Sequence, residues 1–168
     1  KTAYEIPKRD WSSDVCSSDL SNQVGQLTTS QFVQLTSGQI RAIETADIAG
    51  VSTNQVAAIV TSQVAGLTTG QIAALSSNQV GQLTTAAFAQ LTSTQLQSIE
   101  TADIAGVTTS QIAGLSSNQV GQFLTAQLAQ FSSNQIQAIE TGDVRGLTSS
   151  QIAGLSSNQV GQLTTSQF

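Results

Sequence analysis

The hexapeptide LTTGQI, at residues 67–72, contains the signals that start a helix. With Thr68 as the N-cap, Gln71 falls at the third helical position, and the two residues can form a capping box. Leu67, just before the cap, and Ile72, just after the box, have the spacing of a hydrophobic staple. The hexapeptide therefore predicts a short helix that begins directly after Thr68.

The same signals recur every eight residues from Leu27 onwards. Eighteen consecutive octads, the last one truncated, follow one another without an insertion. Positions 1 and 6 are apolar in all eighteen octads, and position 3 is Ser or Thr in all eighteen. Position 5 is Gln in fourteen octads. Self-similarity at a fixed period is typical of repeat architectures, so we expect one repeat region rather than an ordinary globular core.

A longer period lies on top of the octads. Residues 83–122 and 123–162 are two blocks of five octads, each with an IET-DxxG unit in the middle and LSSNQVGQ at the end. Residues 27–82 form a related block with two additional octads, and residues 163–168 are a truncated octad. We expect residues 21–168 to be a fragment of a longer repeat array, since the chain also lacks an initiating Met.

The apolar spacing alternates between five and three residues, which excludes one continuous element. A continuous helix would rotate the pattern by about 80° per octad, and a continuous strand would place positions 1 and 6 on opposite faces. One short element per octad remains. Because isolated helices shorter than about 12 residues are marginal, stability must come from stacking neighbours. The sequence predicts an all-α, elongated solenoid of very short helices, one per octad.

A Thr-rich β-solenoid is the alternative. Position 6 is Val or Ile in thirteen octads, and the abundant Thr also favours strands. A cap at position 2 leaves the uniform Ser or Thr at position 3 without an explanation. Position 2 is not Ser or Thr in five octads, and there we expect the cap to move to position 3; these residues are Glu44, Val60, Glu100, Leu124 and Glu140.

The composition excludes several classes of function. Charged residues make up 9% of the chain, against about 25% in typical proteins, and the net charge is −5. The repeats contain two Arg and no Lys, which excludes a phosphate-binding surface for nucleic acid. No apolar run approaches the roughly 18 residues that span a membrane. Many hydroxyls are present, but neither His nor a repeat Lys could activate one, so we expect no enzymatic activity and no cofactor.

Three acid pairs are the candidate sites of the repeats. They recur at i, i+3 within the IET-DxxG units, and pairs on successive coils could bind a divalent cation through carboxylate oxygens. The alternative is that acids in a first helical turn cap backbone amides and favour the positive end of the helix. The pairs are Glu44 with Asp47, Glu100 with Asp103, and Glu140 with Asp143.

The octad resembles two known repeats. LTTGQIAAL (67–75) is similar to the opening helix of the TAL-effector DNA-reading repeat. The second helix and the base-reading loop of that repeat are absent, so DNA recognition does not carry over. Residues 21–168 more closely resemble LTTAQIxAL-type octapeptide arrays of large bacterial surface or secreted proteins, which are often described as adhesins, haemagglutinins or haem-utilisation proteins.

This second resemblance implies a non-enzymatic stalk, spacer or adhesive region outside a bacterium or on its surface. It also implies a protein or cell-surface partner. Haem binding is not expected, because no His, Cys, Met or Tyr in the repeats could ligate iron. Two alternatives remain open: a module that binds a peptide or protein in a solenoid groove, and a scaffold stiffened by cations at the acid pairs.

Residues 1–20 do not follow the repeat, which stops between residues 20 and 21. They contain the single Trp and the single Cys of the chain, Trp11 and Cys16. DWSSDVCSSDL (10–20) resembles the translation of a common sequencing-library adapter, and KTAYEI (1–6) resembles that of the matching upstream primer. We interpret residues 1–20 as a non-native segment, disordered or arbitrary in structure, and assign no site to its Trp or Cys.

Deleting residues 1–20 should leave the thermal midpoint of the repeats unchanged. The reason is that an accidental peptide has not been selected to pack against them. A far-UV circular dichroism melt of the shortened and full chains tests this expectation. A substantial fall in the midpoint of the shortened chain would contradict it.

Overall fold

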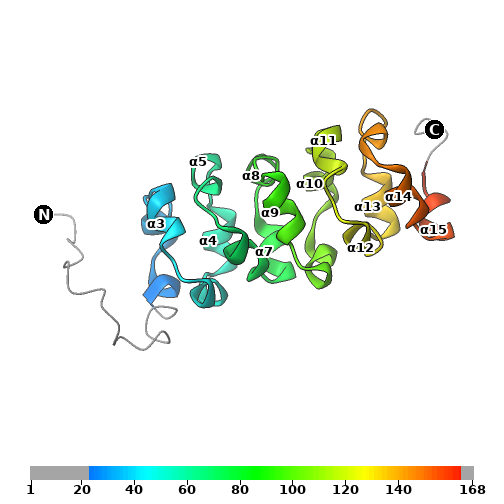
Figure 1. Ribbon diagram of the computed structural model, residues 1–168. Helices are drawn as coiled ribbons and strands as arrows, with labels where there is room; N and C mark the ends of the chain where they lie inside the picture. Colours follow the sequence, from blue (N-terminus) through cyan, green and yellow to red (C-terminus); the bar gives the residue numbers. More distant parts are fainter. Residues whose placement is uncertain (1–22, 164–168) are drawn as a thin grey trace, which may run out of the picture.

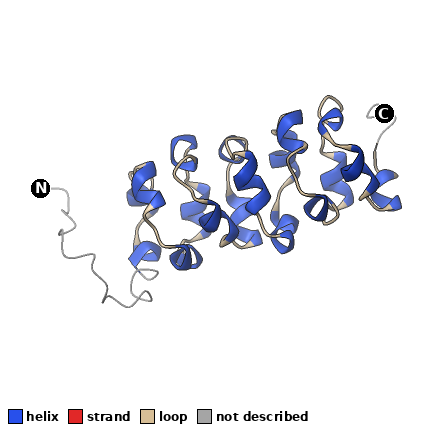
Figure 2. Ribbon diagram, in the orientation of Figure 1, coloured by secondary structure: helices blue, strands red, loops and turns tan. Residues whose placement is uncertain are grey.

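The computed structural model describes residues 23–163, which form a rod of short helices. The helices follow one another along the rod in chain order, from the first described repeats at one end to the last at the other (Figure 1). Only helices, turns and loops occur in this range (Figure 2), which confirms the all-α solenoid. Residues 1–20 and the truncated octad beyond Leu163 lie outside the described range.

Each described octad from residue 27 onwards forms one helix. Three are 3₁₀ helices, and all three belong to the IET-DxxG units: η1 (Thr45–Gly50), η2 (Thr101–Gly106) and η3 (Val144–Gly146). The remaining octads form the α-helices α2 (Thr29–Phe32), α3 (Ser37–Arg41), α4 (Thr53–Ala57), α5 (Thr61–Val64), α6 (Thr69–Ala73), α7 (Ser77–Gln82), α8 (Thr85–Phe88), α9 (Ser93–Ser98), α10 (Thr109–Ala113), α11 (Ser117–Val120), α12 (Thr125–Leu128), α13 (Ser133–Gln137), α14 (Ser149–Ala153) and α15 (Ser157–Val160).

The predicted capping box is present at LTTGQI. The Gln71 backbone N–H donates to Thr68 Oγ1 at 3.1 Å, and the Thr68 backbone N–H donates to Gln71 Oε1 at 2.8 Å. The prediction that the cap moves to position 3 is wrong at Val60 and Leu124, which remain the N-caps of α5 and α12. There the Gln oxygen still accepts the N–H of position 2, at 3.1 and 2.8 Å, so one half of the capping box is retained.

The N-cap also stays at position 2 in two of the IET-DxxG octads. Glu44 and Glu100 are the N-caps of η1 and η2 and have extended backbone conformations. Neither makes a side-chain capping bond. These octads therefore lack both halves of the capping box, and their chain winds as a 3₁₀ helix instead.

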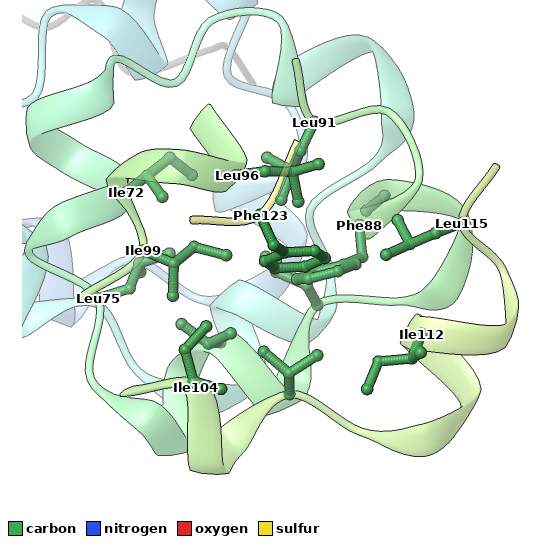
Figure 3. Packing of buried hydrophobic residues seen from close by; sticks show 14 of the residues in the cluster. Ile72, Leu75, Phe88, Leu91, Leu96, Ile99, Ile104, Ile112, Leu115 and Phe123 are labelled. Atoms are coloured by element: carbon green, nitrogen blue, oxygen red, sulfur yellow. The ribbon is translucent and has the colours of Figure 1, made fainter. Parts of the chain in front are cut away.

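The hydrophobic core consists almost entirely of side chains at positions 1 and 6 of the octads. Among the described residues, Ala87 is the single buried hydrophobic residue at any other position. Figure 3 shows side chains from several turns, including Phe88 and Phe123, meeting in the middle of the rod. The rings of Phe123 and Phe131 pack edge to face, with centroids 5.3 Å apart. The two apolar positions of each octad thus form one continuous core.

One turn of the solenoid takes between three and four octads. The helix of one octad contacts the helix three octads later, as in the contacts of α4 with α7 and of α6 with α9. The glutamine at position 5 reaches further back. Gln111 Nε2 donates to the carbonyls of Val80 at 2.9 Å and of Leu83 at 2.7 Å, 31 and 28 residues earlier.

These carbonyls lie at the C-terminal end of α7, where helical carbonyls lack partners within their own helix. The Oε1 atom of the same Gln111 side chain accepts the N–H of its own N-cap, Thr108, at 2.7 Å. One carboxamide therefore joins the start of a helix to the end of a helix in the preceding turn. We call the set of these bonds the glutamine ladder; its members are Gln55, Gln63, Gln71, Gln79, Gln95, Gln111, Gln119, Gln127, Gln135, Gln151 and Gln159.

Several glycines at position 8 are explained by the distance between turns. Position 3 of one octad faces position 8 of the octad three repeats later, and position-8 glycines lie close to either the backbone or the side chain of that residue. A Cβ atom at Gly106 would overlap the backbone of Ser77. A Cβ at Gly154 would overlap the side-chain methyl of Thr125. A residue larger than Gly at these position-8 sites would hold the turns apart.

Gly106→Ala should destabilise the rod by about 1 to 3 kcal/mol, because the added methyl must displace the Ser77 backbone. Gly142→Ala is the matched control in the following block, where a Cβ meets nothing within 4 Å. We expect the control to be neutral or slightly stabilising. Thermal melts of both variants test the close approach, and equal midpoints would contradict it.

Gln111→Glu should lower the free energy of unfolding by at least about 2 kcal/mol. The carboxylate can still accept the Thr108 N–H, but it has no N–H to donate and leaves buried carbonyls unpaired. Gln39→Glu is the matched control, because Gln39 is exposed and its described bonds are those of the capping box alone.

Denaturant unfolding of both variants measures the difference. The difference should shrink as the pH falls towards the ordinary glutamate pKa of about 4.3, because burial raises the pKa of the introduced carboxyl and the protonated form regains a donor. Similar losses in the two variants would show that Gln111 acts through its capping box and not through the ladder.

Candidate functional site

The first acid pair has one exposed and one buried member. Glu44 is exposed and precedes η1, whereas Asp47 is 1% exposed. Asp47 Oδ1 has no hydrogen-bond partner. Asp47 occupies position 5, where most octads have Gln, but its carboxylate has no N–H and cannot donate to carbonyls of another turn.

The other two pairs are more accessible. Glu100 and Glu140 are exposed, and Asp103 and Asp143 are half-buried. The expectation that these acids cap backbone amides is not met, since Glu44, Glu100 and Asp143 each occupy an N-cap position without a side-chain capping bond. Asp47 and Asp103 do lie in the first turn of their helices, where a carboxylate interacts favourably with the positive end of the helix dipole.

The pairs are distributed along the rod. Glu44 and Glu100 are seven octads apart, and Glu100 and Glu140 are five octads apart, so more than one turn separates each pair from the next. The 3₁₀ helices contact α-helices of neighbouring turns: η1 contacts α6, η2 contacts α7 and α12, and η3 contacts α11. Within residues 23–163, no three acidic, His or Cys side chains gather as metal ligands would.

The surface of the described repeats has a depression between successive turns. It has a volume of about 600 Å3 and is lined by α6, by the junction of α9 and η2, and by the first turn of α12. These segments belong to successive turns. Leu124, at position 2 of its octad, lies on the lining and is 46% exposed. Glu100 provides the only ionisable side chain of the lining.

Sequence reasoning predicted the capping role of glutamine and missed its donor role. The signal was present at position 5. A capping box accepts Glu as readily as Gln, yet no octad has Glu there. The choice of Gln rather than Glu in fourteen octads indicates that the nitrogen of the side chain is needed as well as the oxygen.

The rod, its one-helix octads and its ladder define a helical solenoid repeat protein. The sequence profile of the ALTTAQ repeat matches residues 40–77, 96–133 and 136–168, which together make up more than half of the chain. The chain therefore belongs to the ALTTAQ repeat family. No curated protein and no solved structure gives a significant match to it. In the part of the chain that the structure describes, no helix is long and apolar enough to cross a membrane.

Adding about 1 mM calcium, a concentration at which weak extracellular calcium sites fill, should leave the thermal midpoint unchanged. The reason is that each acid pair offers two carboxyl groups and lies more than one turn from the next pair. A circular dichroism melt with and without calcium tests this. A rise in the midpoint that is lost in the Glu100→Gln, Asp103→Asn double variant would contradict the expectation and support cation stiffening.

Proposed function

We propose that this chain is a non-enzymatic spacer, a rod that separates other parts of a large bacterial surface or secreted protein. The observation that carries the proposal is the glutamine ladder. It joins each turn to the preceding one by the same bonds, so length can be added octad by octad without changing the interfaces. A spacer needs this property.

The chemistry of the described surface supports the same function. Ser, Thr, Asn and Gln dominate the exposed positions, with few charged groups among them. Hydroxyls and carboxamides without a neighbouring base provide no route to nucleophilic catalysis. An exterior location and an adhesive role rest on the resemblance of the octads to arrays in bacterial surface proteins.

Small-angle X-ray scattering tests the spacer function. Inserting a second copy of residues 83–122 after Gln122 keeps the octad register, so the maximum dimension should grow while the cross-sectional radius stays constant. The matched control inserts only four residues, LTTS, at the same point. It shifts the register by half an octad and should lower the thermal midpoint. A compact particle, or growth in cross-section, would argue against a spacer.

A binding module is the second candidate, and the depression around Leu124 favours it. A side chain that is 46% exposed at the rim of a hollow can contact an apolar group of a bound peptide. Leu124→Thr restores the residue type found at position 2 of most octads, so it should preserve the fold. Binding of the chain to immobilised extracellular-matrix proteins should fall in this variant. Equal binding by both chains would remove this candidate.

A further inference from the structure

The octads that contain SNQVGQ and the IET-DxxG octads occur at a fixed distance from each other. The glycine of SNQVGQ lies 25 residues before the glycine that ends the next IET-DxxG octad, so the two octads are three repeats apart. The same distance recurs in every block. The three glycine pairs are Gly25 with Gly50, Gly81 with Gly106, and Gly121 with Gly146.

The length of the blocks varies only outside this interval. Block 27–82 contains two octads more than blocks 83–122 and 123–162. Both additional octads lie between the IET-DxxG octad and the LSSNQVGQ that follows it, where the longer block has three octads and the others have one. The interval from SNQVGQ to IET-DxxG stays constant, which indicates that a contact between the two octads constrains it.

The structure contains this contact. The helix α7, which SNQVGQ forms, packs against η2. A Cβ atom at Gly81 would lie 2.6 Å from the carbonyl oxygen of Gly106, which is closer than a side chain can approach. In the other direction, a Cβ at Gly106 would overlap the carbonyl of Ser77. Neither glycine position has room for a side chain.

The same contact recurs in the other blocks. The helix α11 packs against η3, and a Cβ at Gly121 would overlap the carbonyl of Gly146. A Cβ at Gly146 would in turn overlap the carbonyl of Ser117. In the first repeats, a Cβ at Gly25 would lie 2.6 Å from the carbonyl oxygen of Gly50. Each IET-DxxG octad therefore meets its SNQVGQ octad backbone to backbone.

Other position-8 glycines of the described repeats lack such a partner. Gly114 faces a side-chain methyl of the earlier turn, and the residue 25 positions before it is Ala89. Gly66 does lie against a backbone, that of Ser37, but the residue 25 positions before it is Arg41. Within the described repeats, two glycines meet across the turns only where an IET-DxxG octad follows SNQVGQ.

The glutamine ladder does not distinguish one octad from its neighbours. Its bonds end on carbonyls of positions 6 and 1, which every octad offers at the same interval. Octads of nearly identical sequence could therefore stack in a wrong order with the same bonds, a common failure of repeat proteins. The IET-DxxG octads supply no ladder donor of their own, because Asp103 and Asp143 stand at position 5 and have no side-chain N–H.

The glycine pair does distinguish the octads. If η2 stacked on the octad before or after α7, the Gly106 carbonyl would meet the position-7 Cβ of Ala73 or Ala89. The present contact leaves no space for a Cβ at that position. Wrong stacking would therefore force the two turns apart.

We propose that each SNQVGQ octad and the IET-DxxG octad three repeats later form a register key, a contact that fixes which octads stack on each other. The key confines changes in the length of the array to the stretch between one key and the next. This inference rests on the proposed spacer function and adds to it where a spacer of this type can be lengthened.

Two insertions of identical sequence test the register key. The inserted segment is two copies of LTTGQIAA (67–74), placed either after Gln90, inside a key, or after Gly114, between two keys. The outside insertion should melt at or above the midpoint of the parent chain, since it adds stacked octads. The inside insertion should melt at least about 3 °C lower than the outside one, because it places an Ala opposite Gly106.

A single methyl group then decides the cause. That Ala is position 7 of the first inserted octad, and replacing it by Gly should restore the midpoint to that of the outside insertion. Gly in place of Ala ordinarily lowers stability, so a rise has to come from relief of the contact. The control makes the same replacement in the second inserted octad, which lies opposite Gly114, as Ala89 does in the parent chain. The control should not raise the midpoint.

Equal midpoints of the two insertions would overturn the register key, and so would a Gly that fails to restore the inside insertion. A rise of the same size in the control would overturn it as well. Small-angle scattering of the outside insertion keeps the two proposals apart. If this chain is no longer than the parent, the spacer function is contradicted, while the restoration by Gly still decides the register key.

Discussion

Every ladder glutamine holds two helix ends with one side chain. Its oxygen accepts the first N–H of its own helix, and its nitrogen donates to the last carbonyls of a helix one turn earlier. Helix ends are where backbone groups lack partners, and helices of four to six residues consist mostly of ends. Without a device that serves both ends, such helices would bury unpaired backbone groups at every turn. The octad is viable because the carboxamide has one acceptor and one donor group at a fixed separation.

Much of this fold was predictable from the residues within one octad. Thr68, Gln71 and the Leu67–Ile72 pair are local signals, and capping depends on atoms that are close in sequence. The burial of positions 1 and 6 followed from their uniform apolar character. The number of octads in a turn did not, because it depends on contacts between residues such as Gln111 and Val80, which no local pattern links. The need for Gly at some position-8 sites was hidden for the same reason.

The exceptions to the ladder show what it contributes. Where position 5 is Asp, as at Asp47 and Asp103, the donor is absent and the octad forms a 3₁₀ helix. Ala87 has neither a side-chain acceptor for its own helix nor a donor for the earlier turn. The helix α8 still forms, and Thr84 alone caps it. Nothing in the structure explains the choice of Ala87. Neighbouring turns that retain their glutamines can hold a single unlinked octad in place.

The carboxamide has a further property, which is that it carries no charge. Bonds between turns therefore do not depend on the protonation of a side chain, and dissolved ions do not screen them as they screen ion pairs. A rod fastened by carboxylates and ammonium groups would loosen with changes in acidity or salinity. A rod fastened by glutamine keeps the same connections in dilute, saline, mildly acidic or mildly alkaline surroundings, so its mechanical behaviour is set by the sequence and not by the medium.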